Sequence, residues 1–238
     1  DCPDLPLNVS RSFLQNDGYS TKIAGHISKK VSDKLKQLYK NDTEQYYKYW
    51  DDINVFVKYG CLKEDKFYDK VKDSLVYKDI YDKYHTLDEF KKISEDKKQK
   101  DKIYYVSDKQ KQAQYINMFK ENDLNAVILD NILDSHFISF IESKNTGTSF
   151  IGIDSGIKEV LGEDTKEEGF DDVKKYFEDM LNNKNVTVEL KSLKTSDVPA
   201  VISANEYENR MKSMQTMYGM DIPSTDILVL NTQNTVVK

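Results

Sequence analysis

Three short, uninterrupted apolar runs constrain the fold of this chain more than any other feature. They lie at residues 103–106, 126–129 and 150–153, and segments with helical spacing separate them at 110–119 and 136–142. Runs of this kind are typical of strands buried on both faces, and strands joined through helices pair in parallel. The sequence therefore predicts a β-α-β-α-β unit with right-handed crossovers.

The region before this unit is predicted to be helical, because its first apolar series recurs every three or four residues, with lysines opposite. That series consists of Ile23, Ile27, Val31, Leu35 and Leu38. Two further helices are predicted to begin at Thr43 and Asp65. The helix from Thr43 carries aromatic residues at helical spacing, which favours packing in a core over a stacking platform for bases. These residues are Tyr46, Tyr47, Tyr49, Trp50, Phe56 and Tyr59.

The region after the unit is predicted to add one helix and three strands. An amphipathic helix is expected at 170–181, and strands are expected at 186–190, 199–202 and 227–230. The strands at 186–190 and 199–202 are predicted to pair with each other. The lysine-rich stretch 91–102 is broken by acidic residues, so we interpret it as a solvated connector rather than a nucleic-acid patch.

Composition excludes several classes of function. The chain has 238 residues, of which 38% are hydrophobic, so it can fill a core. Its charges are mixed in sign and sum to only -6, which argues against nucleic acid as a partner. No apolar run approaches the roughly 18 residues of a membrane span, so no membrane contact is expected. The two cysteines and three histidines lack metal-ligand spacing, so we expect no bound metal and a reducing, cytoplasmic location.

Arginine stands at only two positions, Arg11 and Arg210, among 35 basic residues. Ser10 is a candidate helix N-cap, which would place Arg11 in the first helical turn beside free backbone N–H groups. A guanidinium and such N–H groups can together bind a phosphate or a carboxylate. The alternative is an arginine that pairs with a nearby acid or faces water. Arg210 lies on the polar side of its predicted helix, and the sequence assigns it no role.

The segment around Arg11, Leu-Pro-Leu-Asn-Val-Ser-Arg-Ser-Phe-Leu-Gln at 5–15, resembles the catalytic loop in the middle domain of the heat-shock protein 90 family. The resemblance is strongest to bacterial members of the HtpG type, and it covers nearly the whole chain. Further segments carry it in the same order. They are 22–31, 56–60, 66–73, 103–106 and 134–137.

The resemblance implies an ATP-dependent molecular chaperone that assists protein folding. Arg11 matches the family arginine that meets the γ-phosphate of ATP, and an arginine finger is the related device in other ATPases. Gln15 and Asn8 match the nearby glutamine and asparagine of the loop. The family often has glutamate after this arginine, whereas this chain has Ser12. An ion pair that holds the loop is therefore expected to be absent.

The resemblance also implies which parts act on which ligands. ATP with Mg is expected to bind in an N-terminal domain that this chain lacks, so no cofactor and no self-contained catalysis are expected here. The expected partners are unfolded or partly folded client proteins and that N-terminal domain. Homodimerisation is expected through C-terminal helices that are also absent. The chain is thus interpreted as a fragment.

The expected fold is α/β, or α+β overall, with a helical block, a small three-layer α-β-α domain and the beginning of a mixed α/β domain. Residues 1–42 are assigned to the catalytic loop and the long helix that closes the large middle subdomain. The helical block is 43–85, the small middle subdomain is 86–182, and the start of the C-terminal domain is 183–238.

A methionine-rich stripe is the expected site for client proteins. Tyr207, Met211, Met214 and Tyr218 fall on one face of a predicted helix. Flexible thioether side chains can contact many apolar partners, so these residues are candidates for binding clients. The alternative is that the stripe packs in a core. The resemblance favours the client role, since it places this segment at the start of the C-terminal domain.

Two other functions remain open. The first is a small-molecule-binding α/β domain that uses the strand ends near Ser107, Asp130 and Asp154, where parallel sheets often bind ligands. No phosphate-binding glycine loop follows the first strand, so we interpret the sheet as a scaffold. The second is a protein-interaction scaffold that acts without nucleotide.

Overall fold

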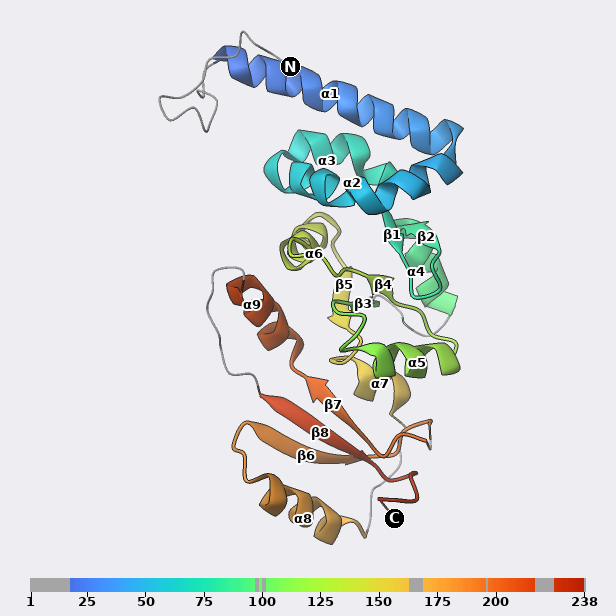
Figure 1. The fold of residues 1–238 in the computed structure, drawn as a ribbon, viewed down its shortest axis with the longest axis vertical. Coiled ribbons are helices and arrows are strands. Elements are labelled where there is room, and N and C mark those ends of the chain that lie inside the picture. Colours follow the sequence, from blue (N-terminus) through green and yellow to red (C-terminus); the bar gives the residue numbers. More distant parts are fainter. Residues whose placement is uncertain are drawn as a thin grey trace. The chain divides into compact units, whose positions relative to one another are not determined.

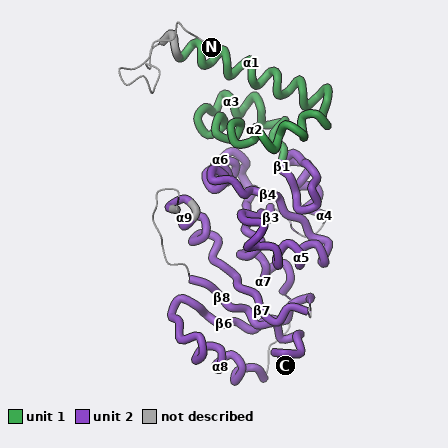
Figure 2. Tube along the Cα trace, viewed as in Figure 1, with its two compact units in different colours: residues 1–76 green, residues 77–238 purple. Residues whose placement is uncertain are grey.

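The computed structural model describes residues 18–96, 99, 102–162, 169–195, 197–216 and 225–237 (Figure 1). The chain divides into two compact units, residues 1–76 and residues 77–238 (Figure 2). No helix in the described part is long and apolar enough to cross a membrane.

The first unit contains the three predicted helices. They are α1 (Gly18–Asn41), α2 (Thr43–Lys63) and α3 (Asp65–Val71), followed by the short 3-10 helix η1 (Lys72–Ser74). The helix α2 starts where predicted because the Asp42 carboxylate accepts the Gln45 N–H at 3.0 Å, which satisfies a free donor of the first turn. Tyr46 is buried and donates its hydroxyl to the Ser74 carbonyl at 2.6 Å.

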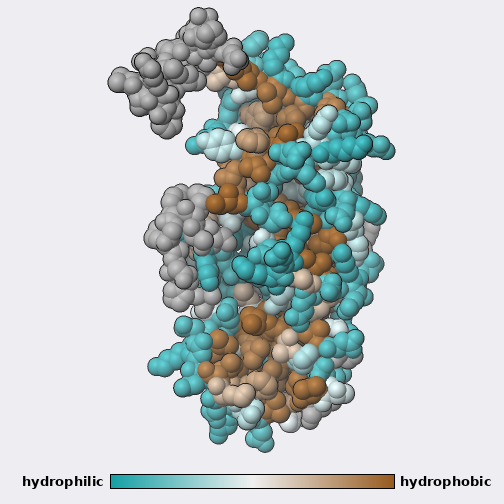
Figure 3. Space-filling view, in the orientation of Figure 1, coloured by the Kyte–Doolittle hydropathy of each residue, from teal (hydrophilic) through white to brown (hydrophobic). Residues whose placement is uncertain are grey.

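The prediction that the aromatic residues of α2 fill a core is only partly correct. Tyr46 and Trp50 stack in the core with ring centroids 5.4 Å apart. Phe56 is 76% exposed, and Tyr49 and Tyr59 are also exposed, because only one face of α2 meets the other helices. The apolar series of α1 divides in a similar way. Its later member Leu35 is buried, whereas Ile27 and Val31 form part of an exposed apolar stripe along the helix (Figure 3).

The second unit contains the predicted parallel sheet. The strands β3 (Lys102–Val106), β4 (Val127–Ile128) and β5 (Ser149–Gly152) have the order β4-β3-β5, and β3 pairs in parallel with both neighbours. The helices α5 (Ala113–Glu121) and α6 (Asp134–Lys144) connect the strands, and α7 (Ile157–Leu161) follows β5. The sheet is therefore confirmed, and β5 is one of its edge strands.

Two parts of this unit were not predicted. The strands β1 (Val76–Lys78) and β2 (Tyr84–Thr86) form a small two-stranded sheet, and α4 (Leu87–Asp96) follows it. The interpretation of 91–102 as a solvated connector is therefore wrong for its first half. The helix α4 begins earlier, at Leu87, and buries Phe90, which lies just outside the lysine-rich stretch.

A second sheet follows α8 (Asp171–Leu181) along the chain. Its strands β6 (Val186–Lys191), β7 (Ala200–Ala204) and β8 (Asp226–Asn231) have the order β6-β8-β7, and α9 (Glu206–Thr216) connects β7 to β8. The predicted pairing of β6 with β7 is wrong, since β8 lies between them, parallel to β6 and antiparallel to β7. Successive residues of β8 point to opposite faces of this sheet. Val229 packs in one apolar cluster and Leu230 in the other.

These two clusters position the second sheet. One cluster joins Val201 and Val229 to Ile157 and Leu161 of α7, so one face of the sheet packs against the first sheet's layer. The other cluster brings α8 onto the opposite face. The observed architecture confirms the predicted α/β class. The division into four segments at 42, 85 and 182 stays a prediction.

Asp79 ties the β1–β2 region to the first sheet. Its side chain is only 1% exposed, and its Oδ2 lies 3.0 Å from His85 Nε2 and 2.8 Å from Asn125 Nδ2. Its Oδ1 accepts the backbone N–H groups of Tyr81 and Lys83. Burial alone would raise the pKa of Asp79, yet these hydrogen bonds together hold the pKa below its ordinary value.

We expect Asp79→Asn to lower the free energy of unfolding by about 1–3 kcal/mol, because the amide would present a donor where the Asn125 amide already donates. A lowered folded-state pKa stabilises the fold above the unfolded value of about 3.9, and this contribution disappears as the pH falls toward the folded value. Urea unfolding between pH 7 and pH 3 measures both effects. Asp69→Asn, at an exposed carboxylate, is the control and should change neither.

Candidate functional site

The residues predicted to act on ATP, Asn8, Arg11 and Gln15, lie outside the described residues, and so does Tyr218. Their roles stay predictions. The other members of the methionine-rich stripe lie on α9. Tyr207 is 72% exposed, while Met211 and Met214 are half-buried. The client-binding role of the stripe also stays a prediction.

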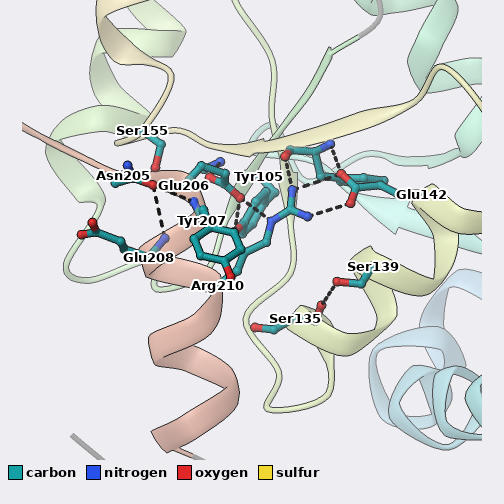
Figure 4. Close-up of polar contacts among 12 residues, drawn as sticks. Tyr105, Ser135, Ser139, Glu142, Ser155, Asn205, Glu206, Tyr207, Glu208 and Arg210 are labelled. Atoms are coloured by element: carbon teal, nitrogen blue, oxygen red, sulfur yellow. Dashed lines mark hydrogen bonds and ion pairs between the residues drawn. The ribbon is translucent and has the colours of Figure 1, made fainter. Parts of the chain in front are cut away.

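The second arginine, Arg210, lies at the centre of an ion cluster that connects α9 to the first sheet (Figure 4). Its Nη1 and Nη2 donate to the two carboxylate oxygens of Glu142 on α6, at 2.7 and 3.1 Å. Its Nε donates to Glu206 on its own helix at 2.6 Å, and Nη2 also donates to the Phe150 carbonyl of β5. The guanidinium thus bonds to groups from three elements at once.

Burial and charge act on Arg210 in opposite directions. Its side chain is 15% exposed, and burial alone would lower the pKa of the guanidinium. The hydrogen bonds and charges of Glu142 and Glu206 outweigh this effect and raise the pKa above its ordinary value. Arg210 therefore remains charged, and its loss would leave two mostly buried carboxylates without their cation.

The same two carboxylates cover the outer edge of β5. The Phe150 N–H donates to Glu142 at 2.7 Å, and the Gly152 N–H donates to Glu206 at 2.6 Å. Tyr105 of β3 donates its hydroxyl to Glu206 at 3.0 Å, and burial followed by the charge of Glu206 raises the pKa of this tyrosine. Backbone groups of an edge strand, which would otherwise be unpaired, are thus satisfied by side chains.

This cluster was missed from sequence, where Arg210 received no role. One signal was present, because Glu206 precedes Arg210 by four residues and the pair therefore lies on one face of a helix. The partner Glu142 is 68 residues away in the chain, and no local pattern indicates its proximity.

The strand ends named for the small-molecule alternative come together only in part. Ser107 and Asp154 line one cavity of about 250 Å³, together with Asp108, Lys111 and Lys212. Asp130 is not among its lining residues. Its carboxylate lies 3.8 Å from Lys109. The cavity is smaller than the roughly 300–1,000 Å³ typical of ligand pockets.

The backbone donors at this edge are also occupied. The N–H groups of Ser107 and Asp108 both donate to the side-chain carbonyl of Gln112, at 2.8 and 3.2 Å. Asp108 in turn accepts the N–H groups of Gln110 and Lys111, each at 3.0 Å. An anionic ligand would have to displace these internal bonds, so the geometry does not favour the small-molecule function.

Metal binding has no support in the described part of the chain, where no group of three or more His, Cys, Asp or Glu side chains could hold an ion. Cys61 is the cysteine that lies within the described residues. Its thiol is buried, and burial raises the pKa of this thiol to about 12. A reactive thiolate is therefore not expected there.

Comparison with known proteins identifies the family. The sequence model of the family described as Hsp90 protein matches residues 1–227. The chain belongs to the heat-shock protein 90 family. The resemblance seen in the segments at 5–15 and 22–31 is thereby confirmed for the chain as a whole.

Several chaperone proteins HtpG are similar to this Hsp90-family chain over its full length. The protein of Bacteroides fragilis is 34% identical over 258 residues, and that of Porphyromonas gingivalis is 32% identical over 257 residues. Both alignments include 100% of this chain, but they span only 38% and 37% of the two HtpG proteins. Among solved structures, the middle domain of a Plasmodium falciparum heat shock protein aligns with a TM-score of 0.44 and 19% identity, over 59% of this chain and 60% of that one.

Gly152 gives a direct test of the ion cluster. A Cβ at this position would lie 2.7 Å from Asp154 Oδ1 and 3.1 Å from Glu206 Oε2. We expect Gly152→Ala to displace the Asp154 carboxylate, to crowd the Glu206 carboxylate, and to lower the free energy of unfolding by about 1–3 kcal/mol. Gly25→Ala is the matched control, since nothing lies within 4 Å of its Cβ position and alanine favours a helix by roughly 0.5–1 kcal/mol. Equal effects of both substitutions in urea unfolding would contradict the expected crowding at Gly152.

Proposed function

We propose that this chain is the later part of the middle domain and the opening of the C-terminal domain of an ATP-dependent, cytoplasmic chaperone of the HtpG type. The observation that carries the proposal is the family match over residues 1–227. The full-length alignments to two HtpG chaperones support it. Because the chain spans less than two fifths of those proteins, ATP hydrolysis and dimerisation are assigned to the larger protein.

Within that protein, Arg11 is the residue that meets the γ-phosphate of ATP held with Mg by an N-terminal domain. A planar, permanently charged guanidinium can neutralise the charge that develops on the terminal phosphate. It would also couple ATP occupancy to the closed form of the dimer. Asn8 and Gln15 would support the same loop. The chain alone is expected neither to bind ATP tightly nor to hydrolyse it.

The client-binding part of the proposal concerns α9. Tyr207 offers an exposed aromatic ring, and Met211 and Met214 offer partly exposed thioethers on the same helix. Figure 3 also shows apolar side chains gathered over the second sheet on the face in view. Together these surfaces suit the apolar segments of unfolded proteins, which differ in sequence and need an adaptable surface.

In the chaperone that contains this segment and an ATP-binding domain, Arg11→Ala should reduce ATP turnover strongly, toward the roughly 10³-fold effect of losing an arginine finger. Nucleotide affinity should stay nearly unchanged, because the adenine pocket lies in another domain. Steady-state ATPase assays and calorimetry measure the two quantities. Lys36→Ala, at an exposed position of α1, is the control. Normal turnover in Arg11→Ala would remove this residue from the mechanism.

Client binding is tested separately with a permanently unfolded protein, such as a reduced and carboxymethylated secreted protein. Met211→Glu and Met214→Glu should each weaken its capture about tenfold, since a carboxylate on this face opposes contact with apolar segments. Gln37→Glu adds the same charge at an exposed position of α1 and should have no effect. Capture that is independent of both methionines would contradict the role of α9. Capture that survives Arg11→Ala is expected, because the two roles use different residues.

A further inference from the structure

The outer edge of β5 has the backbone donors and acceptor that another strand would need, and side chains now occupy them. Because β3 pairs with β5 on one side, the Phe150 and Gly152 N–H groups and the Phe150 carbonyl point to the other side. All three groups are satisfied by side chains. Glu142 and Glu206 accept the two N–H groups, and Arg210 donates to the carbonyl. An added strand would satisfy the same groups with its own backbone.

Charged side chains join the helix α9, which supplies most of this cover, to the edge. Of the α9 side chains that the structure describes, none is buried, and none belongs to the two apolar clusters that pack α7 and α8 against the second sheet. Glu206 and Arg210 make hydrogen bonds from α9 to α6, β3 and β5. Departure of α9 would therefore break this ion cluster, and it would leave the two apolar clusters of the second sheet intact.

At the N-terminal end of α9, Asn205 separates the helix from β7, and its side chain caps the helix by accepting the N–H groups of Tyr207 and Glu208. The apolar contacts of β7 and β8 belong to the sheet and not to α9. The sheet can thus keep its position when the helix leaves β5.

We propose that α9 is a detachable cover of the β5 edge, and that an extended segment of unfolded polypeptide pairs with this edge when α9 leaves. The inference rests on the proposed chaperone function and adds a backbone-recognition site to it. An unfolded chain suits the site because its N–H and C=O groups are present in every sequence. Strand addition would therefore hold clients that share no side-chain pattern.

Arg210 is the positioning residue in this arrangement. Its fork contacts Glu142, Glu206 and the Phe150 carbonyl together, so removing it frees both carboxylates to turn away from the edge. Lysine has one ammonium group and cannot reach the same acceptors in this geometry. Arg210→Lys should therefore behave like Arg210→Ala, although it keeps the charge.

The experiment uses the 238-residue chain with two readouts. Hydrogen exchange measured by mass spectrometry reports on residues 206–216 and 149–152. Fluorescence anisotropy reports the binding of a labelled, extended apolar peptide and of the same peptide N-methylated at alternate residues. In Arg210→Ala we expect about tenfold faster exchange in both segments and about tenfold tighter binding of the unmodified peptide. The N-methylated peptide should lose this gain, because the methyl groups remove the N–H donors of one of its edges. Lys175→Ala, which removes an exposed charge on α8, should match the wild type.

Each outcome decides the proposal. Equal gains with the unmodified and the N-methylated peptide would overturn strand addition, since side chains alone would then hold the peptide. Unchanged exchange and binding in Arg210→Ala would overturn the cover while leaving client binding by the wild type intact. If Arg210→Ala does not fold, Glu206→Gln replaces it, because the Arg210–Glu142 pair then remains. Failure of all variants and the wild type to capture any unfolded protein would contradict the proposed function itself.

Discussion

The second unit depends on one constraint, namely that an edge strand in a short parallel sheet must not leave its backbone groups unpaired. Three strands are few, and among the described residues β5 has no further strand on its outer side. The chain meets this constraint with two carboxylates and a guanidinium instead of a fourth strand. The choice has a geometric consequence. The side chains that satisfy β5 come from α6 and α9, so satisfying the edge also fixes where α9 lies.

Charge and apolar packing have different tasks in this unit. Apolar clusters join the two sheets through Val201, Val229 and Leu161, and they bring α8 onto the second sheet. The described side chains of α9 take no part in either cluster. Tyr207 of this helix is 72% exposed, so its ring is available to a partner. A surface for unfolded proteins requires this availability, because residues consumed by a core cannot contact a partner.

The sequence predicted those features that depend on local periodicity. Continuous apolar runs indicated β3, β4 and β5, and their parallel pairing followed from the helices between them. Local patterns did not predict the order of the second sheet, since the neighbour of β6 is a strand about 40 residues away that follows β7 and α9. The Arg210–Glu142 pair could not be predicted for the same reason. The exposure of Phe56 shows a related limit, because helical spacing identifies a face but not whether another element covers it.

The rarity of arginine was nevertheless informative. A chain that uses lysine for almost every positive charge places arginine where one side chain must donate in several fixed directions. Arg210 meets that requirement, since its acceptors are two carboxylates and a backbone carbonyl from three elements. A lysine ammonium also has three donors, but it lacks the planar fork that reaches acceptors in these fixed directions. The same physical reasoning supports the proposal for Arg11, because the several oxygens of a terminal phosphate suit a planar, multidentate donor. The sequence nevertheless assigned Arg210 no role, because Glu142 and Phe150 lie far from it in the chain and only the long-range structure identifies them as its acceptors.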